Sequence, residues 1–359
     1  MNIKNSIIKK FTIKIRNSIF VFFEKILITL FRIIPRSSKD RTIIVFFTSR
    51  AGRGLKISDA ASSLFDSYPK QLSNISRFLQ FNSRIWLINT LKLLVYCIFY
   101  KDCRVVLHQY VPNFYYSPSL RLLEFIDNRG AKIIKIWMDT YNDNLWDQRI
   151  NQISHLGNLN IIIDTPKLRT KKFTRSNSYR YFPIPIKSLP LVAHSDRTRF
   201  VYYSGGVENY GIYKPRKDVL DFLEQNDIRV DGTQYNRTLP GKRPEYATYR
   251  SELSQSLIGL NFTWKGDSDV LVTRTWEILS SGTLLLQNKS DLFQGLLTPG
   301  IHYIEFSCNS ELLEILKTLK NDRIQLEKIA LAGKKQYENL FQTETFWETV
   351  IGSDFKILR

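Results

Sequence analysis

The chain has 359 residues, of which 43% are hydrophobic and 24% are charged, a globular composition that excludes a disordered chain. This length predicts two domains, each large enough to bury a core of its own. The net charge of +19 predicts attraction to an anionic partner, namely nucleic acid, an acidic membrane surface or a phosphorylated substrate, and does not choose among them.

The first thirty-six residues combine basic and apolar side chains. Lysines and an arginine precede the apolar run Ile19–Phe23, charged Glu24 and Lys25 interrupt it, and the apolar character continues to Pro35. A membrane-spanning helix needs about 20 nearly uncharged residues, so we predict no span, and no cleavage site indicates a signal peptide. Two interpretations stay open: an amphipathic helix on an anionic membrane leaflet, or a helix that packs on the protein's own first domain.

From residue 42 the pattern alternates between strands and helices. Such alternation predicts a parallel sheet covered by helices on both faces. The expected strands are Thr42–Thr48, Val105–His108, Ile133–Trp137 and Asn160–Ile163. The expected helices are Ser83–Tyr100, a second with Ser117 as its cap and Gly130 at its end, and Leu145–Leu156, which Gly157 ends.

The same alternation restarts after the proline-containing stretch Tyr181–Ile186 and a linker to Arg199. The sequence therefore predicts a second α/β domain, with the binding site in the cleft between the two, at the carboxyl ends of strands. The expected strands are Phe200–Tyr203, Ile228–Val230, Ile258–Phe262, Thr283–Leu286 and Ile301–Phe306, and the expected helices are Pro215–Gln225, Glu245–Ser256, Val270–Ser281 and those that follow Ser310.

One short helix carries the residue types that a nucleoside diphosphate needs. Arg274 and Glu277 are three residues apart and so share a helix face, and Asp269 lies at the expected helix start, where free N–H groups attract phosphate. A carboxylate can accept two hydrogen bonds from a ribose diol, and an arginine can bind a diphosphate through its planar fork. Spacing alone leaves the alternative of a surface Arg–Glu pair followed by a glycine cap at Gly282.

The stretch from residue 246 to 313 resembles the donor-binding half of GT-B glycosyltransferases, nearest to the branch of the CgeB-like proteins and the "glycosyl transferases group 1" relatives. The matching steps are a helix with Tyr249, the strand Ile258–Phe262, the helix Arg274–Gly282, the turn Pro299–Gly300 and the segment Ser310–Leu313. The resemblance covers roughly residues 200–350, whereas the N-terminal half matches only in its strand–helix rhythm.

This resemblance implies roles for several residues. Glu277 resembles the carboxylate that binds the ribose, and Asp269 stands where retaining relatives have a glutamate, which leaves retention or inversion open. Gly205 and Gly206 resemble the loop whose backbone approaches the diphosphate. Gly282 belongs to the same donor-side motif.

Arg216, with Lys214 and Lys217, follows that loop and could hold phosphate, although a solvated helix start is an equal alternative. The resemblance also implies that a last helix, anchored by Phe346 and Trp347, crosses back onto the N-terminal domain. We thus expect a basic amphipathic segment (1–40), an acceptor-side Rossmann-like domain (41–187), a nucleotide-sugar-binding Rossmann-like domain (188–342) and a crossing helix (343–359).

The acceptor and the catalytic base are expected in the N-terminal domain. Gly52 and Gly54 follow its first strand, His108 ends the second, and Asp139 follows the third. Asp139 and His108 are candidates for the base of an inverting reaction, with a structural hydrogen-bonding role as the alternative for each.

Other site classes lack their motifs. Gly-Arg-Gly at residues 52–54 lacks the third glycine of a dinucleotide fingerprint, and no phosphate-binding Gly-Lys-Ser/Thr occurs. The three cysteines are scattered and the four histidines have no metal-ligand spacing, so the sequence predicts no metal, no cofactor and a reducing, cytoplasmic compartment.

We therefore predict a metal-independent, hexosyltransferase-like enzyme. It would move a sugar from a nucleotide-sugar donor to a glycan or lipid-linked acceptor, in cell-surface polysaccharide or lipopolysaccharide synthesis on the inner face of the cell membrane. The alternatives are a non-catalytic sugar-nucleotide-binding relative and a basic nucleic-acid-binding protein, for which no recognition motif is present.

Overall fold

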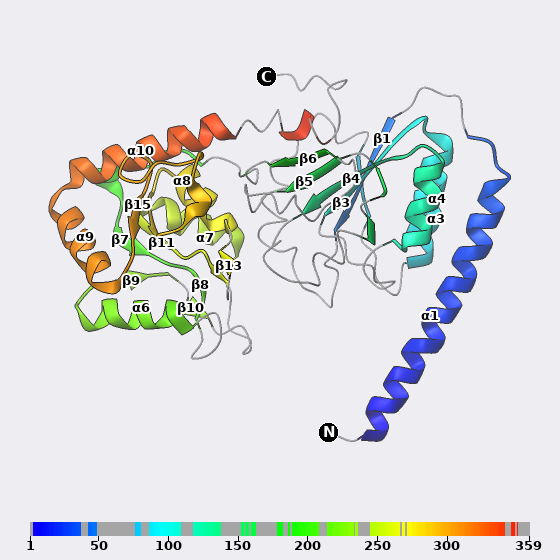
Figure 1. Ribbon diagram of the computed structural model, residues 1–359, viewed down its shortest axis with the longest axis horizontal. Helices are drawn as coiled ribbons and strands as arrows, with labels where there is room; N and C mark the ends of the chain where they lie inside the picture. Colours follow the sequence, from blue (N-terminus) through cyan, green and yellow to red (C-terminus); the bar gives the residue numbers. More distant parts are fainter. Residues whose placement is uncertain are drawn as a thin grey trace.

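The computed structural model shows two α/β domains, each with its own parallel sheet (Figure 1). It describes residues 3–36, 42–48, 76–79, 86–108, 118–137, 152–153, 155–157, 159–162, 178–181, 186, 189–207, 214–232, 234–235, 245–265, 268–269, 271–341, 346–348 and 350.

The sheet of the first domain contains six described strands, all parallel, in the order β2-β1-β3-β4-β5-β6. Two of these strands, β2 and β6, are additions to the four that the sequence predicts. Both lie at the edges, and each has four residues of which two are polar, so their apolar signal in the sequence is weak. The bounds are β1 Thr42–Thr48, β2 Ser76–Leu79, β3 Asp102–His108, β4 Lys132–Trp137, β5 Leu159–Ile162 and β6 Ser178–Tyr181.

Alternating side chains divide the core of this domain between the two faces of the sheet. Ile43 and Val45 of β1 pack with helices α3 (Trp86–Phe99) and α4 (Leu120–Asn128), whereas Ile44 and Phe46 face the opposite side. Because both faces of β1 are covered, its sequence is apolar without alternation from Ile43 to Phe47, which is typical of a parallel sheet.

The helix predicted to have Ser117 as its cap begins two residues later than predicted. Ser119, not Ser117, is the N-cap of α4, and its hydroxyl accepts a hydrogen bond from the backbone N–H of Leu122 at 3.0 Å. Ser117 lies outside the described residues. The end is as predicted, since Gly130 adopts a positive φ of 82°, which glycine tolerates best.

Helix α1 (Ile3–Arg32) packs through its C-terminal half on the first domain. Ile28 and Phe31 are buried with α3 and α4, and the ring of Phe20 stacks on Trp86 at 4.9 Å. This contact supports the interpretation of a helix that packs on its own domain. No helix in the described part of the chain is long and apolar enough to cross a bilayer.

The sheet of the second domain is also parallel, with its five described strands in the order β15-β14-β11-β7-β9. Two short pairs of two-residue strands, β8 with β10 and β12 with β13, accompany it. The bounds are β7 Arg199–Tyr202, β8 Gly205–Gly206, β9 Val230–Asp231, β10 Gln234–Tyr235, β11 Ser256–Asn261, β12 Trp264–Lys265, β13 Ser268–Asp269, β14 Leu284–Asn288 and β15 Ile304–Phe306.

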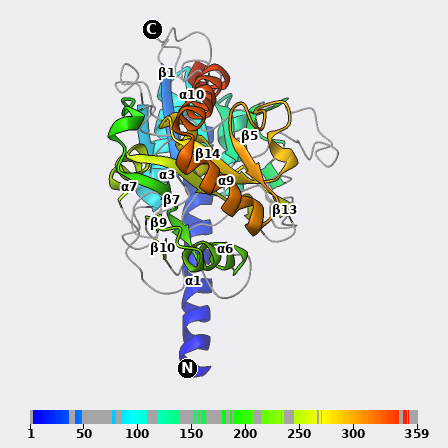
Figure 2. The same ribbon diagram turned by 90° about the vertical axis from the view of Figure 1, so that its left-hand side faces the viewer.

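Helices cover both faces of this second sheet (Figures 1 and 2). Leu284 and Leu286 of β14 pack with α6 and α9, whereas Leu285 between them packs with the face that carries α7 and α8. The long helix α10 contributes to both clusters. The bounds are α6 Lys214–Gln225, α7 Tyr246–Ser254, α8 Thr273–Ser280, α9 Asn309–Asn321 and α10 Arg323–Leu340.

The chain returns to the first domain at its C-terminal end. Residues 346–348 are helical, Phe346 and Trp347 are fully buried, and the edge of Trp347 meets the ring of Phe46 at a centroid distance of 6.0 Å. The predicted crossing of the last segment onto the N-terminal domain is therefore confirmed, as is the predicted fold of two Rossmann-like domains.

Candidate donor site

The candidate site lies where the strand order of the second sheet reverses. From β7 the chain adds β9 on one side and then β11, β14 and β15 on the other, and open parallel sheets bind ligands beyond the carboxyl ends of the two strands at such a reversal. Tyr203 and Gly205 follow β7, Asn261 ends β11, and the first turn of α8 carries Arg274. Three segments distant in sequence are thus brought together at the position where open parallel sheets bind ligands.

Glu277 is the buried carboxylate of this site. It is 5% exposed, and its Oε2 accepts a hydrogen bond of 2.9 Å from the hydroxyl of Tyr249 on α7. Burial, and then the negative charge of Glu277, raise the pKa of Tyr249 well above its ordinary value, so the phenol stays neutral and donates. Because Glu277 is buried, the alternative of a solvated surface Arg–Glu pair is wrong.

The backbone around Glu277 is held from two directions. The guanidinium of Arg250 donates to the carbonyl of Glu277 at 2.8 Å, and the hydroxyl of Ser281 donates to the same carbonyl at 2.8 Å. On the sheet side, a Cβ at Gly259 would lie 2.7 Å from Ile278, so only glycine lets α8 approach β11 this closely. The Ile-Gly-Leu-Asn-Phe strand thereby sets the height of Glu277 above the sheet.

Arg274 forms the basic part of the site. Its guanidinium lies over the ring of Tyr203 at 4.8 Å, and its Nη1 donates to Asn261 Oδ1 at 3.4 Å. A Cβ at Gly205 would lie 2.6 Å from Arg274 Nη2, so the glycine leaves room for the guanidinium beside the backbone. A planar fork placed next to a glycine backbone suits an anion such as a diphosphate.

A buried amide network holds Asn261 in place. Its Nδ2 donates to Gln287 Oε1 at 2.7 Å and to Thr275 Oγ1 at 2.9 Å. Gln287 Nε2 in turn donates to Asn288 Oδ1 at 2.6 Å, and Asn288 Oδ1 accepts from the backbone N–H of Thr263 at 2.8 Å. These residues are almost fully buried, so the network fixes the orientation in which Asn261 presents Oδ1 to Arg274.

The basic residues at the start of α6 separate into two groups. Lys214 and Lys217 pair with Asp218 and Asp221, each four residues later on the same helix, at 2.7 and 2.5 Å. These pairs support the alternative of a solvated helix start for the two lysines. Arg216 differs from them, because it is 5% exposed and lies on the buried face of α6.

Two further predicted residues lie outside helix α8. The expectation that Asp269 begins the helix is wrong: α8 begins at Thr273, and Asp269 pairs with Trp264 in the short β12–β13 hairpin. Gly282 lies at the other end of α8 from Arg274, with a φ of 65°, and its carbonyl lies 3.1 Å from His194 Nε2. Its positive φ makes it the turn residue that ends the helix.

The candidate residues of the first domain are only partly described. His108 is the last residue of β3 and stands opposite Thr48 of β1, at the point where the order of the first sheet reverses. Asp139, Gly52 and Gly54 lie outside the described residues.

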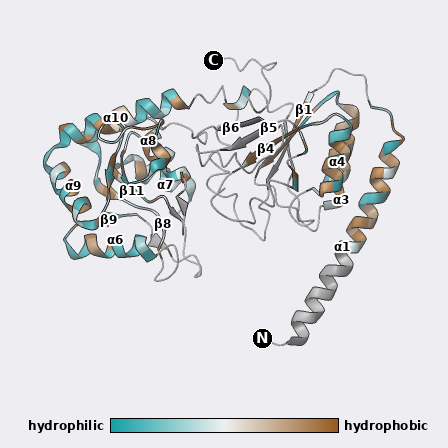
Figure 3. Ribbon diagram, viewed as in Figure 1, coloured by the Kyte–Doolittle hydropathy of each residue, from teal (hydrophilic) through white to brown (hydrophobic). Residues whose placement is uncertain are grey.

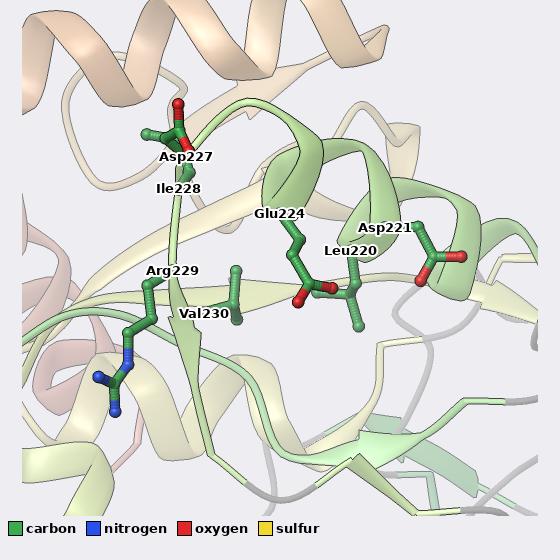
Figure 4. Close-up of a pocket in the computed structure, with 7 residues that line it drawn as sticks. All are labelled: Leu220, Asp221, Glu224, Asp227, Ile228, Arg229 and Val230. Carbon is green, nitrogen blue, oxygen red and sulfur yellow. The ribbon is translucent and has the colours of Figure 1, made fainter.

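A surface pocket of about 380 Å³ lies at the end of α6, apart from this site. Asp221, Glu224, Asp227 and Arg229 contribute its charged side chains. In Figure 4 these side chains diverge: Asp227 and Asp221 point away from each other, and Arg229 points away from both. The described residues contain no group of three or more acidic, histidine or cysteine side chains that could hold a metal ion.

Sequence reasoning did not assign site roles to Tyr203, Asn261 and the amides Gln287 and Asn288. A signal was present for the last two, because polar amides end an otherwise apolar, buried strand, and such residues lie at the binding edge of a parallel sheet.

A comparison with protein families finds a match that falls mostly on the second domain. Residues 216–351 match the family model described as Glycosyl transferase-like, close to the 200–350 expected from the sequence. No curated protein sequence matches the chain.

Solved structures match both domains together. Anabaena HepE in complex with UDP-glucose has a TM-score of 0.56 at 10% identity, over 87% of this chain and 98% of its own. An alpha-glucosyltransferase in complex with UDP-glucose and DNA has 0.57 at 11% identity, over 87% and 100% of the two chains. T4 phage BGT in complex with UDP-glucose has a TM-score of 0.51 at 14% identity, over 88% of this chain and 100% of its own. The predicted GT-B fold is confirmed, whereas the CgeB-like branch stays a prediction.

Proposed function

We propose that this GT-B chain is a glycosyltransferase that takes a hexose from a UDP-sugar bound at the Arg274–Glu277 site. The buried Glu277 carboxylate, held by Tyr249 and placed one helical turn from Arg274, carries the proposal. Its Oε1 side can accept from a ribose diol while Arg274 binds the diphosphate. The UDP-glucose complexes of three structures with this fold support uridine as the nucleoside of the donor.

In this proposal residues 188–342 bind the donor and residues 41–187 bind the acceptor. The acceptor is a glycan or a lipid-linked sugar of cell-surface polysaccharide or lipopolysaccharide synthesis, and residues 1–36 associate with the inner face of the cell membrane. The basic charge of these residues, and the exposed apolar side chains of α1 such as Ile19 and Leu30, support this arrangement.

Replacing Arg274 tests the diphosphate part of the site. We expect Arg274→Ala to weaken UDP binding by about tenfold to a hundredfold, because a forked, charge-assisted contact is lost. Uridine carries no phosphate, so its affinity should stay within about twofold. Titration calorimetry with UDP and uridine measures both, and an equal loss for the two ligands would mean that Arg274 does not bind the diphosphate. Lys217→Ala, on a helix-paired lysine, is the matched control.

Replacing His108 or Asp139 tests the proposed base. A general base contributes about a hundredfold or more, so we expect kcat to fall by about that factor for the residue that acts as base, with UDP-sugar affinity unchanged. The pH–rate profile should lose its acidic limb in the same variant. If both variants keep kcat and the profile, the base lies elsewhere.

A further inference from the structure

Helix α1 carries a second apolar stripe, which faces away from the protein. Its packed side is formed by residues such as Ile28 and Phe31, yet four other apolar side chains of the helix are exposed at intervals of four and three residues, which places them on one face. They are Ile19, Phe23, Ile26 and Leu30, and exposed Ile33 follows directly after the end of the helix. A helix that served only to cover its own domain would have no need of this stripe.

Helix α3 carries a matching stripe beside it. Ile88, Leu91 and Phe99 are 53%, 42% and 57% exposed, while the opposite face of α3 is buried in the core. The two helices run in the same direction: Phe20 meets Trp86 at the start of α3, and Arg36 donates to the carbonyl of Lys101 just after its end. Figure 3 shows hydrophobic residues along both helices.

The charges around these stripes are positive. Lys25 and Arg32 on α1 and Lys92 on α3 are exposed, and five more lysines and arginines precede residue 17 in the sequence. The one acidic residue of α1, Glu24, is 1% exposed and turned inward, where its Oε1 accepts from the hydroxyl of Ser119 at 2.5 Å. The exposed side of α1 is therefore basic and apolar, without a negative charge.

We propose that α1 and α3 together form a docking face for an anionic lipid bilayer, with the exposed stripes inserted at the headgroup–acyl boundary and the basic side chains on the phosphates. A basic apolar helix pair matches the chemistry of such an interface. A second copy of this face would bring like charges together, which disfavours a dimer through it. The inference extends the proposed membrane association of residues 1–36 to α3, and it does not depend on donor binding.

The location of this face has a consequence for donor access. α1 lies on the side of the first domain away from the second domain (Figure 1). A protein docked through this face keeps its Arg274–Glu277 site off the bilayer and open to a water-borne nucleotide sugar.

Vesicle flotation of the full chain tests the inference. The probes are phosphatidylcholine vesicles with and without phosphatidylglycerol, and the variant is Ile88→Gln with Leu91→Gln on α3. We expect its partition onto anionic vesicles to fall at least about tenfold, because two inserted apolar side chains are lost. The matched control, Ile301→Gln with Ile324→Gln, changes two residues of the second domain that are more exposed than Ile88 and Leu91, and it should bind as the wild type does.

Each contrary result has a distinct meaning. If the wild type binds and the α3 variant binds equally, α3 is not part of the face and the inference is overturned. Equal binding to vesicles without phosphatidylglycerol overturns the role of the basic residues. If the wild type binds neither vesicle, the membrane association of residues 1–36 fails as well. Should the α3 variant change the oligomeric state while its vesicle binding is unchanged, the face is a protein contact. UDP affinity, measured on every variant, reports folding and the donor site separately.

Discussion

Glu277→Ala should abolish measurable donor binding in a protein that still folds. Two charge-assisted hydrogen bonds to a ribose diol, each worth about 1.5–3 kcal/mol, would be lost, which corresponds to a fall in UDP affinity of roughly two to four orders of magnitude. In a thermal-shift assay, UDP at about 100 times its wild-type Kd should stabilise the wild type by about 2.7 kcal/mol and the variant by no more than about 0.4 kcal/mol. The same variant should lose sugar transfer and donor hydrolysis in proportion.

Three further variants show that the effect belongs to the carboxylate. Tyr249→Phe removes the hydroxyl bonded to Glu277 but keeps the carboxylate, so donor affinity should fall far less than in Glu277→Ala. Glu277→Gln keeps an acceptor for Tyr249, so it separates loss of charge from loss of packing. Glu252→Ala removes a carboxylate that accepts from Tyr202 at the same 2.9 Å and should bind UDP normally. Wild-type affinity in Glu277→Ala would reject the donor site.

Trp347→Ala should strongly destabilise the protein, although Trp347 lies far from the donor site in sequence. The side chain is fully buried and packs edge-on against Phe46 of β1 and against Phe346. Removing a buried tryptophan typically costs about 3–5 kcal/mol, through lost burial and the cavity left behind. Urea unfolding, followed by circular dichroism, should show a lower midpoint for this variant.

The destabilisation should follow the loss of the ring. Trp347→Phe keeps an aromatic side chain against Phe46, so it should lower the free energy of unfolding by less than half as much as Trp347→Ala does. Phe99→Ala removes an aromatic residue that is 57% exposed, and its free energy of unfolding should change by no more than about 0.5 kcal/mol. If Trp347→Ala unfolds at the wild-type urea concentration, the C-terminal segment does not hold the two domains together.

Local patterns in the sequence were sufficient for most of the fold. The runs at Thr42–Thr48 and Ser256–Asn261 are apolar because parallel strands are buried on both faces. Such a run can be recognised in the sequence without knowing which strands and helices pack against it. The edge strands β2 and β6 were missed because each has only four residues and two of the four are polar. The start of α4 was misplaced because Ser117 and Ser119 both suit an N-cap, and only the backbone geometry selects the second.

The donor site was likewise predicted from the sequence only in part. The spacing of Arg274 and Glu277 follows from helix geometry, so the sequence alone placed them on one face. The burial of Glu277, its hydrogen bond to Tyr249, and the contact of Arg274 with Asn261 and Tyr203 depend on α7, α8, β7 and β11 meeting at one edge of the sheet. Such contacts join residues separated by 13 to 71 positions, and no local pattern encodes which of them meet.

The N-terminal helix shows the same limit most clearly. Its sequence determined that it is basic, apolar and too interrupted to span a bilayer, and it left membrane binding and packing on the protein as equal alternatives. The tertiary structure decided that one face of α1 packs on α3 and α4 while another stays exposed. The reason is that α1 has apolar side chains on two faces, and α3 and α4 cover only one of them.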